Sequence, residues 1–132
     1  MDVTLPTPLL GGLSPAQFMR RHWQKKPLLV RQAWPGVQSP IGRSALFDLA
    51  GAEGVEARLL TAFGGDWRLR HGPFSRRVLP PVKQPNWTLL VQGLDLHWQP
   101  AHAMLQAFRF VPEACLDDLM ISYATDGGGV GP

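Results

Sequence analysis

The sequence has little cysteine and no long apolar run. Cys115 is the only cysteine among 132 residues, so no disulfide can form within the chain and no Cys-x-x-Cys pair can hold zinc. A chain without disulfides is typical of a reducing compartment, and we expect a cytoplasmic protein in which Cys115 is a small apolar filler. No apolar run approaches the ~20 residues that span a membrane, and the first residues lack the segments of a signal peptide. We therefore expect no membrane contact.

Acidic residues are absent from positions 3 to 47. Residues 1–83 carry 12 Lys and Arg against 5 Asp and Glu, a balance of +7, whereas residues 84–132 carry 1 against 5, a balance of −4. A basic front half suits an acidic partner such as ribosomal RNA or a ribosome surface. A solvated basic face without a partner has the same composition, so both interpretations stay open.

Metal-binding and nucleophilic motifs are also absent. The histidines form no His-x-x-x-His or His-x-Asp pair, although a metal site needs three or four converging ligands; they are His22, His71, His97 and His102. Asp117 and Asp118 are adjacent and would point to opposite faces of a strand, which favours a turn or capping role. The residues themselves thus indicate no catalytic group and no metal ligands.

Glycine and proline are abundant, with 14 and 13 copies, which predicts short elements joined by turns. A first helix should begin at Pro15, with Ser14 and Gln17 forming a capping box, and should end before Pro27. Its buried stripe is predicted to contain Ala16, Met19 and Trp23.

The remaining pattern predicts an α+β fold. We expect a helix at 44–50 ended by Gly51 and a helix that follows Pro100 and ends at Pro112. Strands are predicted at 28–32, 56–62, 66–71, 86–92 and 118–124, with a hairpin at Gly64-Gly65. The last strand is apolar on both faces, so both should be buried, which suggests further strands beyond it.

The glycine run 127–131 has two interpretations. It fits neither a P-loop nor a dinucleotide fingerprint. It could be a flexible tail, or a loop in which glycine permits close backbone approach to a ligand. The preceding Asp126 is either a turn residue or a carboxylate partner for a guanidinium.

Five successive parts of the chain resemble the JmjC/cupin-type ribosomal oxygenases, most closely the bacterial ribosomal protein arginine hydroxylases. They are 10–15 with 22–29, then 56–60, 71–74 and 86–93, and finally 117–122 with 127–132. The resemblance implies the first part of a double-stranded β-helix (jelly roll) that is truncated. It makes 1–132 one domain, with 1–85 as a basic lead-in and 86–132 as the start of the JmjC core, cut before a His-x-Asp motif.

The resemblance also implies a chemistry. The full-length family uses Fe(II) and 2-oxoglutarate to hydroxylate an arginine of a large-subunit ribosomal protein, and the full-length protein could be a homodimer. All iron ligands would follow Pro132, so we expect this chain to bind neither iron nor cosubstrate and to be inactive alone. The positions that match the site wall are Met120, Ser122, Tyr123 and Asp126, and the site's loop would be Gly127, Gly128, Gly129, Gly131 and Pro132.

A second hypothesis is a non-catalytic basic module that binds ribosomal RNA or a ribosomal protein. The acid-free stretch 3–47 favours it. A steep salt dependence of RNA binding would support this hypothesis.

Overall fold

The computed structural model describes residues 2–131, which divide into two compact units. One unit comprises the residues up to 39 together with 106–117, and the other comprises 40–105 with the residues from 118 onward. Each unit draws on both sides of residue 86, so the units do not follow the predicted segments 1–85 and 86–132. Within the described residues, no helix is long and apolar enough to cross a membrane.

The first unit contains the helix α1 (Pro15–Arg21) and the short 3-10 helices η1 (Pro8–Leu10), η2 (Gln106–Phe108) and η3 (Glu113–Cys115). The predicted capping box is confirmed: Gln17 N donates to Ser14 Oγ at 3.2 Å, and Ser14 N donates to Gln17 Oε1 at 3.0 Å. The predicted end before Pro27 is wrong. The helix stops at Arg21, and Gln24 has a φ of 55°, a left-handed conformation that breaks the helix before the proline is reached.

The predicted strand at 28–32 does not form. A strand needs a hydrogen-bonded neighbour, and this segment has none among the described residues, while the Leu29 side chain is 79% exposed. The predicted stripe of α1 is partly wrong as well, because Ala16 is exposed. Phe18 takes the central place, with ring contacts to His22, Trp23 and Phe110.

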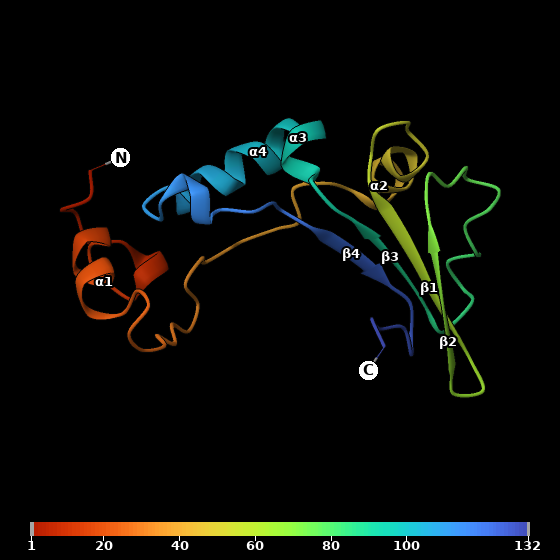
Figure 1. Ribbon diagram of the computed structural model, residues 1–132, viewed down its shortest axis with the longest axis horizontal. Helices are drawn as coiled ribbons and strands as arrows, with labels where there is room; N and C mark the ends of the chain where they lie inside the picture. The colour runs from red at the N-terminus through yellow and green to blue at the C-terminus, as the bar shows by residue number, and fades with distance from the viewer. Residues whose placement is uncertain (1, 132) are drawn as a thin grey trace. The chain divides into compact units, whose positions relative to one another are not determined.

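The second unit contains an antiparallel sheet of order β2-β1-β3-β4 (Figure 1). Its strands are β1 (Ala57–Phe63), β2 (Asp66–His71), β3 (Trp87–Val91) and β4 (Ile121–Ala124). The predicted hairpin is confirmed: Gly64 and Gly65 join β1 to β2 with φ values of 55° and 91°, which glycine adopts without steric cost. The mixture of helices and antiparallel strands confirms the α+β class.

Three helices accompany the sheet: α2 (Arg43–Ala50), α3 (Leu94–His97) and α4 (Gln99–Leu105). The first ends at Gly51 as predicted, whereas α3 was not predicted because it is a single turn. The helix expected after Pro100 begins one residue earlier and ends at Leu105, followed by η2, so Pro112 does not end it.

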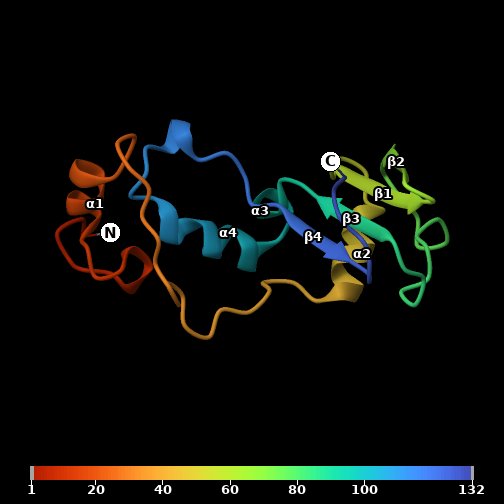
Figure 2. The same cartoon turned by 90° about the horizontal axis from the view of Figure 1, so that it is seen from below.

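The core lies on the face of the sheet that α2 covers (Figure 2). From β3, Trp87, Leu89 and Val91 are fully buried, and Phe47 of α2 contacts the Trp87 ring with 6.0 Å between ring centroids. The Trp87 indole nitrogen donates to the Pro81 carbonyl at 3.1 Å, which satisfies its one polar group inside the core.

The two edge strands are more exposed than predicted. In β4, Ile121 and Tyr123 are half-buried while Ser122 and Ala124 are exposed, so the expected burial of both faces is wrong for the described residues. All six residues of β2 are exposed. Cys115 is exposed too, which overturns its interpretation as a core filler.

Candidate functional site

The second face of the sheet, which we call the open face, points away from the core. Strand alternation and the observed register place on it Arg58, Leu60, Ala62, Trp67, Leu69, His71, Thr88, Leu90, Ser122 and Ala124. Its centre is apolar and buried, because Leu60 and Leu90 are 7% and 4% exposed. Its margins are exposed, because Leu69 is 52% exposed and Trp67 is 39% exposed.

Two buried polar atoms on the open face lack a hydrogen-bond partner within the described chain. They are Arg58 Nε and Thr88 Oγ1, and Thr88 is only 2% exposed. A buried polar group without a partner costs about 1–3 kcal/mol, so native proteins rarely keep one without a use. Both atoms are therefore available to a ligand or to a further segment that covers this face.

The segment with the glycine run 127–131, which we call the glycine loop, folds back over the end of β3. Asn86 N donates to the Asp126 carbonyl at 2.8 Å, and Thr125 N donates to the Trp87 carbonyl at 3.0 Å. A Cβ on Gly128 would lie 2.9 Å from Thr125 O and from Thr88 Oγ1. The close backbone approach that the glycines permit is thus made to β3 of this chain.

The same loop reaches the aromatic ring at the margin of the open face. Gly129 and Gly131 lie beside the Trp67 ring, where a Cβ would be 3.5 Å from its nearest ring atom. The loop therefore forms a lip along one end of the open face. Pro132, the last of the predicted loop residues, lies outside the described residues.

The predicted wall residues divide between two places. Ser122 and the preceding Met120 alternate with the half-buried residues of β4, and Met120 is 49% exposed. Tyr123 points to the opposite, core face, where its ring lies 5.1 Å from the Phe47 ring and 5.7 Å from Trp87. Contact with substrate stays a prediction for each of them.

Asp126 lines a separate hollow at the end of β4. The hollow has a volume of about 530 Å³ and is also lined by Tyr123, Thr125 and Lys83. Asp126 itself is exposed, and its backbone carbonyl accepts the Asn86 hydrogen bond, as a turn residue would. This backbone role leaves the carboxylate free to meet a cation that enters the hollow.

Comparison with known proteins identifies relatives of this arrangement. No family model matches the chain. It is 40% identical over 116 residues to the ribosomal protein uL16 3-hydroxylase of Escherichia coli (strain K12), and 36% identical over 121 residues to a probable ribosomal oxygenase of Haemophilus influenzae. These matches cover 87% and 90% of this chain but 30% of each relative.

Solved structures agree with the sequence matches. The structure of YcfD, a ribosomal oxygenase from Escherichia coli, superposes with a TM-score of 0.77 at 37% identity, covering 90% of this chain and 32% of that one. The structure of YcfD in complex with cobalt and 2-oxoglutarate superposes with a TM-score of 0.75 at 38% identity. This match covers 88% of this chain and 32% of that one.

The chain is similar to the N-terminal portion of the ribosomal oxygenases.

The resemblance predicted from the sequence is thereby confirmed. The α+β arrangement also matches the N-terminal region of a ribosomal oxygenase, as expected for the first part of a cupin/JmjC fold. The chain spans about 30% of the length of the curated ribosomal oxygenases that it matches.

A metal centre of the kind seen in the cobalt complex of YcfD does not fit the residues in hand. Throughout positions 2–131, no group of three or more His, Cys, Asp or Glu side chains lies together in a way that could hold a metal ion.

Asp118, the second residue of the acidic pair before β4, links β4 to α3. Asp118 Oδ2 accepts a hydrogen bond from Gly93 N at 2.6 Å, and Leu119 N donates to Asp95 Oδ1 at 3.0 Å. These two bonds attach the start of β4 to α3 and so fix where Met120 and Ser122 lie. The sequence could not reveal this pairing, because 24 and 25 residues separate the partners.

Sequence reasoning also missed Arg58 and Thr88. Both lie inside predicted strands, but only the register shows that they share the open face, with Arg58 opposite Leu90 and Thr88 opposite Leu60. An alternation pattern applied to all four strands together would have found them.

Proposed function

We propose that this chain forms the N-terminal part of an Fe(II)/2-oxoglutarate-dependent oxygenase that hydroxylates an arginine of a large-subunit ribosomal protein. The observation that carries the proposal is the 40% identity over 116 residues with the uL16 3-hydroxylase of Escherichia coli. The TM-score of 0.77 to YcfD supports it independently of the alignment. The protein substrate proposed by this similarity is uL16, and the location proposed with it is the cytoplasm.

In this proposal the open face is one wall of the substrate site. Met120 and Ser122 border it, the glycine loop closes one end, and the unpartnered Arg58 Nε and Thr88 Oγ1 supply polar groups to whatever covers it. Asp126 receives the substrate guanidinium in the separate hollow at the end of β4, because a carboxylate is the bidentate partner that a guanidinium prefers. Iron and 2-oxoglutarate would be held by residues outside those described.

A second candidate function is a non-catalytic basic module that contacts ribosomal RNA. The observation that favours it is the exposure of Arg20, Arg21, Lys25 and Lys26 in and after α1, without an acidic residue in the first turn of that helix. A homodimer of the full-length protein belongs to the first proposal and does not distinguish between the two.

A chimera tests the first proposal. The matching N-terminal part of the E. coli uL16 3-hydroxylase is replaced by this chain, and the chimera is expressed in a strain without the native enzyme. Mass spectrometry of uL16 should show the gain of one oxygen atom on an arginine. The intact E. coli enzyme is the positive control, and the same enzyme without its N-terminal part is the negative control.

A folded chimera that leaves uL16 unmodified while the intact enzyme hydroxylates it would contradict the proposal. Fold is checked by circular dichroism, so that a misfolded chimera is not taken for an inactive one. An Asp126→Asn chimera should retain its fold and lose most of its activity if the carboxylate receives the arginine.

A further inference from the structure

Residues 66–83 carry an unbalanced positive charge on the surface of the sheet unit. Five cations lie in this stretch against a single acid, Asp66, and all five are exposed: Arg68, Arg70, Arg76, Arg77 and Lys83. We call the first four of them the arginine edge. They lie outside the acid-free stretch 3–47 and outside the open face, so neither the sequence analysis nor the proposed oxygenase site has given them a role.

The first two arginines share one face of an edge strand. Arg68 and Arg70 lie opposite Thr61 and Leu59, so their side chains leave β2 on the side that α2 covers. Residues two apart in a strand are separated by roughly 7 Å. Since β2 has only β1 as a neighbour within the described sheet, the surface beyond these two side chains is open to a large partner.

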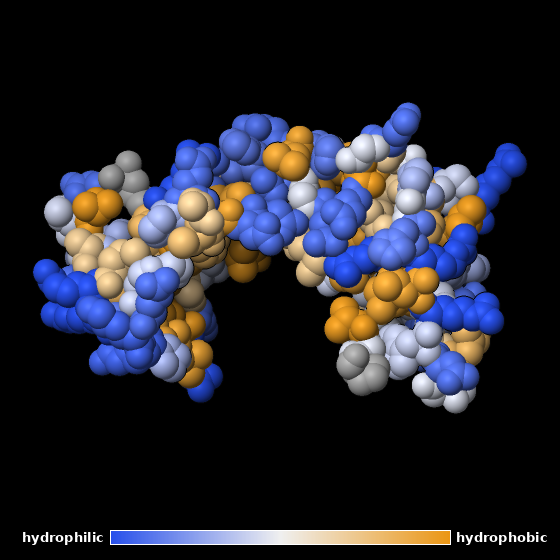
Figure 3. Space-filling view, in the orientation of Figure 1, coloured by the Kyte–Doolittle hydropathy of each residue, from blue (hydrophilic) through white to orange (hydrophobic). Residues whose placement is uncertain are grey.

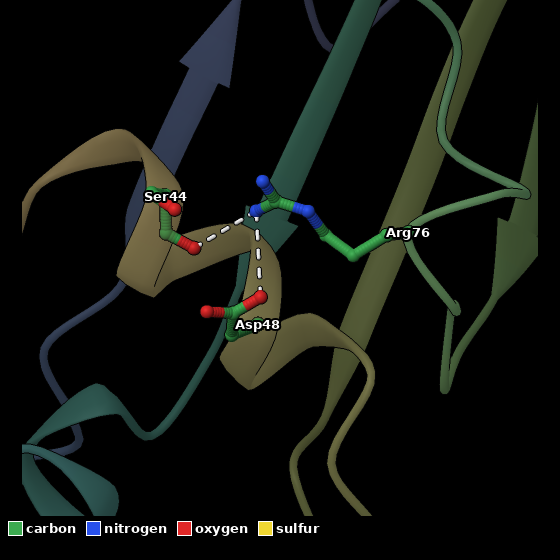
Figure 4. A network of polar contacts seen from close by, with 3 residues as sticks. All are labelled: Ser44, Asp48 and Arg76. Carbon is green, nitrogen blue, oxygen red and sulfur yellow. Dashed lines mark hydrogen bonds and ion pairs between the residues drawn. The ribbon is translucent and has the colours of Figure 1, made fainter.

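Aromatic rings and a helix hold the guanidinium groups in place. Arg70 lies over the Phe74 ring at 5.8 Å, and Phe74 is 2% exposed. Arg76 lies over the Phe47 ring at 5.4 Å, and its Nη1 donates to the Ser44 carbonyl of α2 at 2.9 Å (Figure 4). When a guanidinium stacks on a ring, its N–H groups can still donate to another acceptor. Because the stacked side chain is already restricted, it loses less entropy on binding that acceptor than a mobile arginine would.

Acidic residues do not neutralise this surface. Only Arg76 has an acidic partner in the described contacts, Asp48 at 3.5 Å, and both side chains are more than half exposed, so the pair is weak in water. Figure 3 shows hydrophilic residues on the β2 side of the sheet unit, with apolar residues between them. Arg68 and Arg70 therefore form a row of two arginine side chains on β2 that have no acidic partner in the described contacts.

A row of this kind fits a partner with regularly repeated negative groups. Arginine binds phosphate through two parallel N–H bonds, and several such contacts at once select a polymer of phosphates over a single anion. We propose that the arginine edge binds the phosphate backbone of RNA. The choice of RNA among polyanions rests on the proposed function, whose protein substrate is a ribosomal component.

Fluorescence anisotropy of a labelled single-stranded RNA with the 132-residue chain tests the proposal over a series of salt concentrations. Each lost phosphate contact lowers the salt slope by about 0.7, so the double variant Arg68→Gln/Arg70→Gln should lower it by about 1.4. This decrease in slope means that the double variant should bind the RNA roughly 20-fold more weakly than the unchanged chain at 0.1 M salt.

The control is Arg109→Gln, which removes an exposed charge from the other unit, outside the stretch 3–47. We expect less than a twofold change in RNA affinity. If this control weakens binding as much as the β2 variant, or if the β2 variant leaves binding unchanged, the arginine edge is not the RNA site.

Two further measurements keep the test decisive. Circular dichroism reports whether the β2 variant folds; if it does not, Arg77→Gln with Lys83→Gln, both on a surface loop, replaces it with the same expected direction. Polyglutamate is the probe for an acidic protein, and binding as strong as that of RNA with the same dependence on Arg68 and Arg70 would overturn the assignment to RNA.

The outcome is separable from that of the oxygenase proposal. The purified chimera is also assayed on free uL16 without RNA, so its activity in that assay does not need the arginine edge. A chimera that hydroxylates uL16 while the chain fails to bind RNA refutes only this inference, and RNA binding by a chain whose chimera is inactive refutes only the oxygenase proposal.

Discussion

Neighbouring glycines in the loop after β4 have different surroundings. A Cβ on Gly128 would overlap the Trp87 carbonyl and approach Thr125 O and Thr88 Oγ1 to 2.9 Å, whereas a Cβ on Gly129 meets only the Trp67 ring, at 3.5 Å. Neither residue has a positive φ, so substitution changes contacts and not backbone strain. The sequence shows three identical glycines in a row and cannot make this distinction.

Gly128→Ala should therefore destabilise the sheet unit by about 1–3 kcal/mol, since the added methyl group must displace backbone atoms of β3 and of the loop. Gly129→Ala is the matched control and should change the free energy of unfolding by less than about 0.5 kcal/mol. Urea unfolding followed by tryptophan fluorescence measures both. Equal effects would mean that the loop does not lie against β3.

At the scale of single elements, helix starts were predicted better than helix ends. The start of α1 depends on Ser14 and Gln17, which are three residues apart, so the sequence contains the whole signal. Its end depends on the left-handed conformation of Gln24, which the sequence does not predict because glutamine rarely adopts this conformation. The strands β1, β2 and β3 were found because each has a partner, while 28–32 has equal strand propensity and none.

Ser14→Ala should weaken α1 by about 1 kcal/mol, because Gln17 N loses its acceptor. Ser44→Ala is the control, since α2 begins after Gly42 and has no side-chain cap. Amide hydrogen exchange across 15–21 should accelerate in the first variant, and exchange across 43–50 should be unchanged in the second. Unchanged protection of α1 after Ser14→Ala would show that packing, and not the cap, maintains the helix.

At the scale of the whole molecule, the residues proposed for the site wall and its loop lie in one unit, and no cluster of metal ligands lies among the described residues. The open face, the glycine loop and Asp126 all belong to the sheet unit, yet the described residues contain no cluster of metal ligands. Non-haem oxygenases need two histidines and a carboxylate around iron. In the proposed function the chain contributes a wall and a lip to such a site.

We accordingly expect no 2-oxoglutarate turnover by the 132-residue chain with Fe(II), 2-oxoglutarate and a uL16 peptide. Succinate release is the measurement, and the E. coli uL16 3-hydroxylase assayed in parallel is the control. Succinate formation above background by the isolated chain would show that residues not grouped in this structure can bind iron.

The sequence by itself determined the α+β class, the capping box of α1, the hairpin at Gly64-Gly65 and the resemblance to the ribosomal oxygenases. These signals are local or depend on residue order, so they can be recognised from the sequence alone. Only the tertiary structure decided which face of each strand is buried, that Tyr123 packs against Phe47, and that Asp118 binds Gly93. It also placed Arg76 beside α2, 32 residues from its Ser44 partner. The physical reason is that burial and pairing depend on which distant segments meet, and strand register, which fixes those meetings, is a property of the whole sheet.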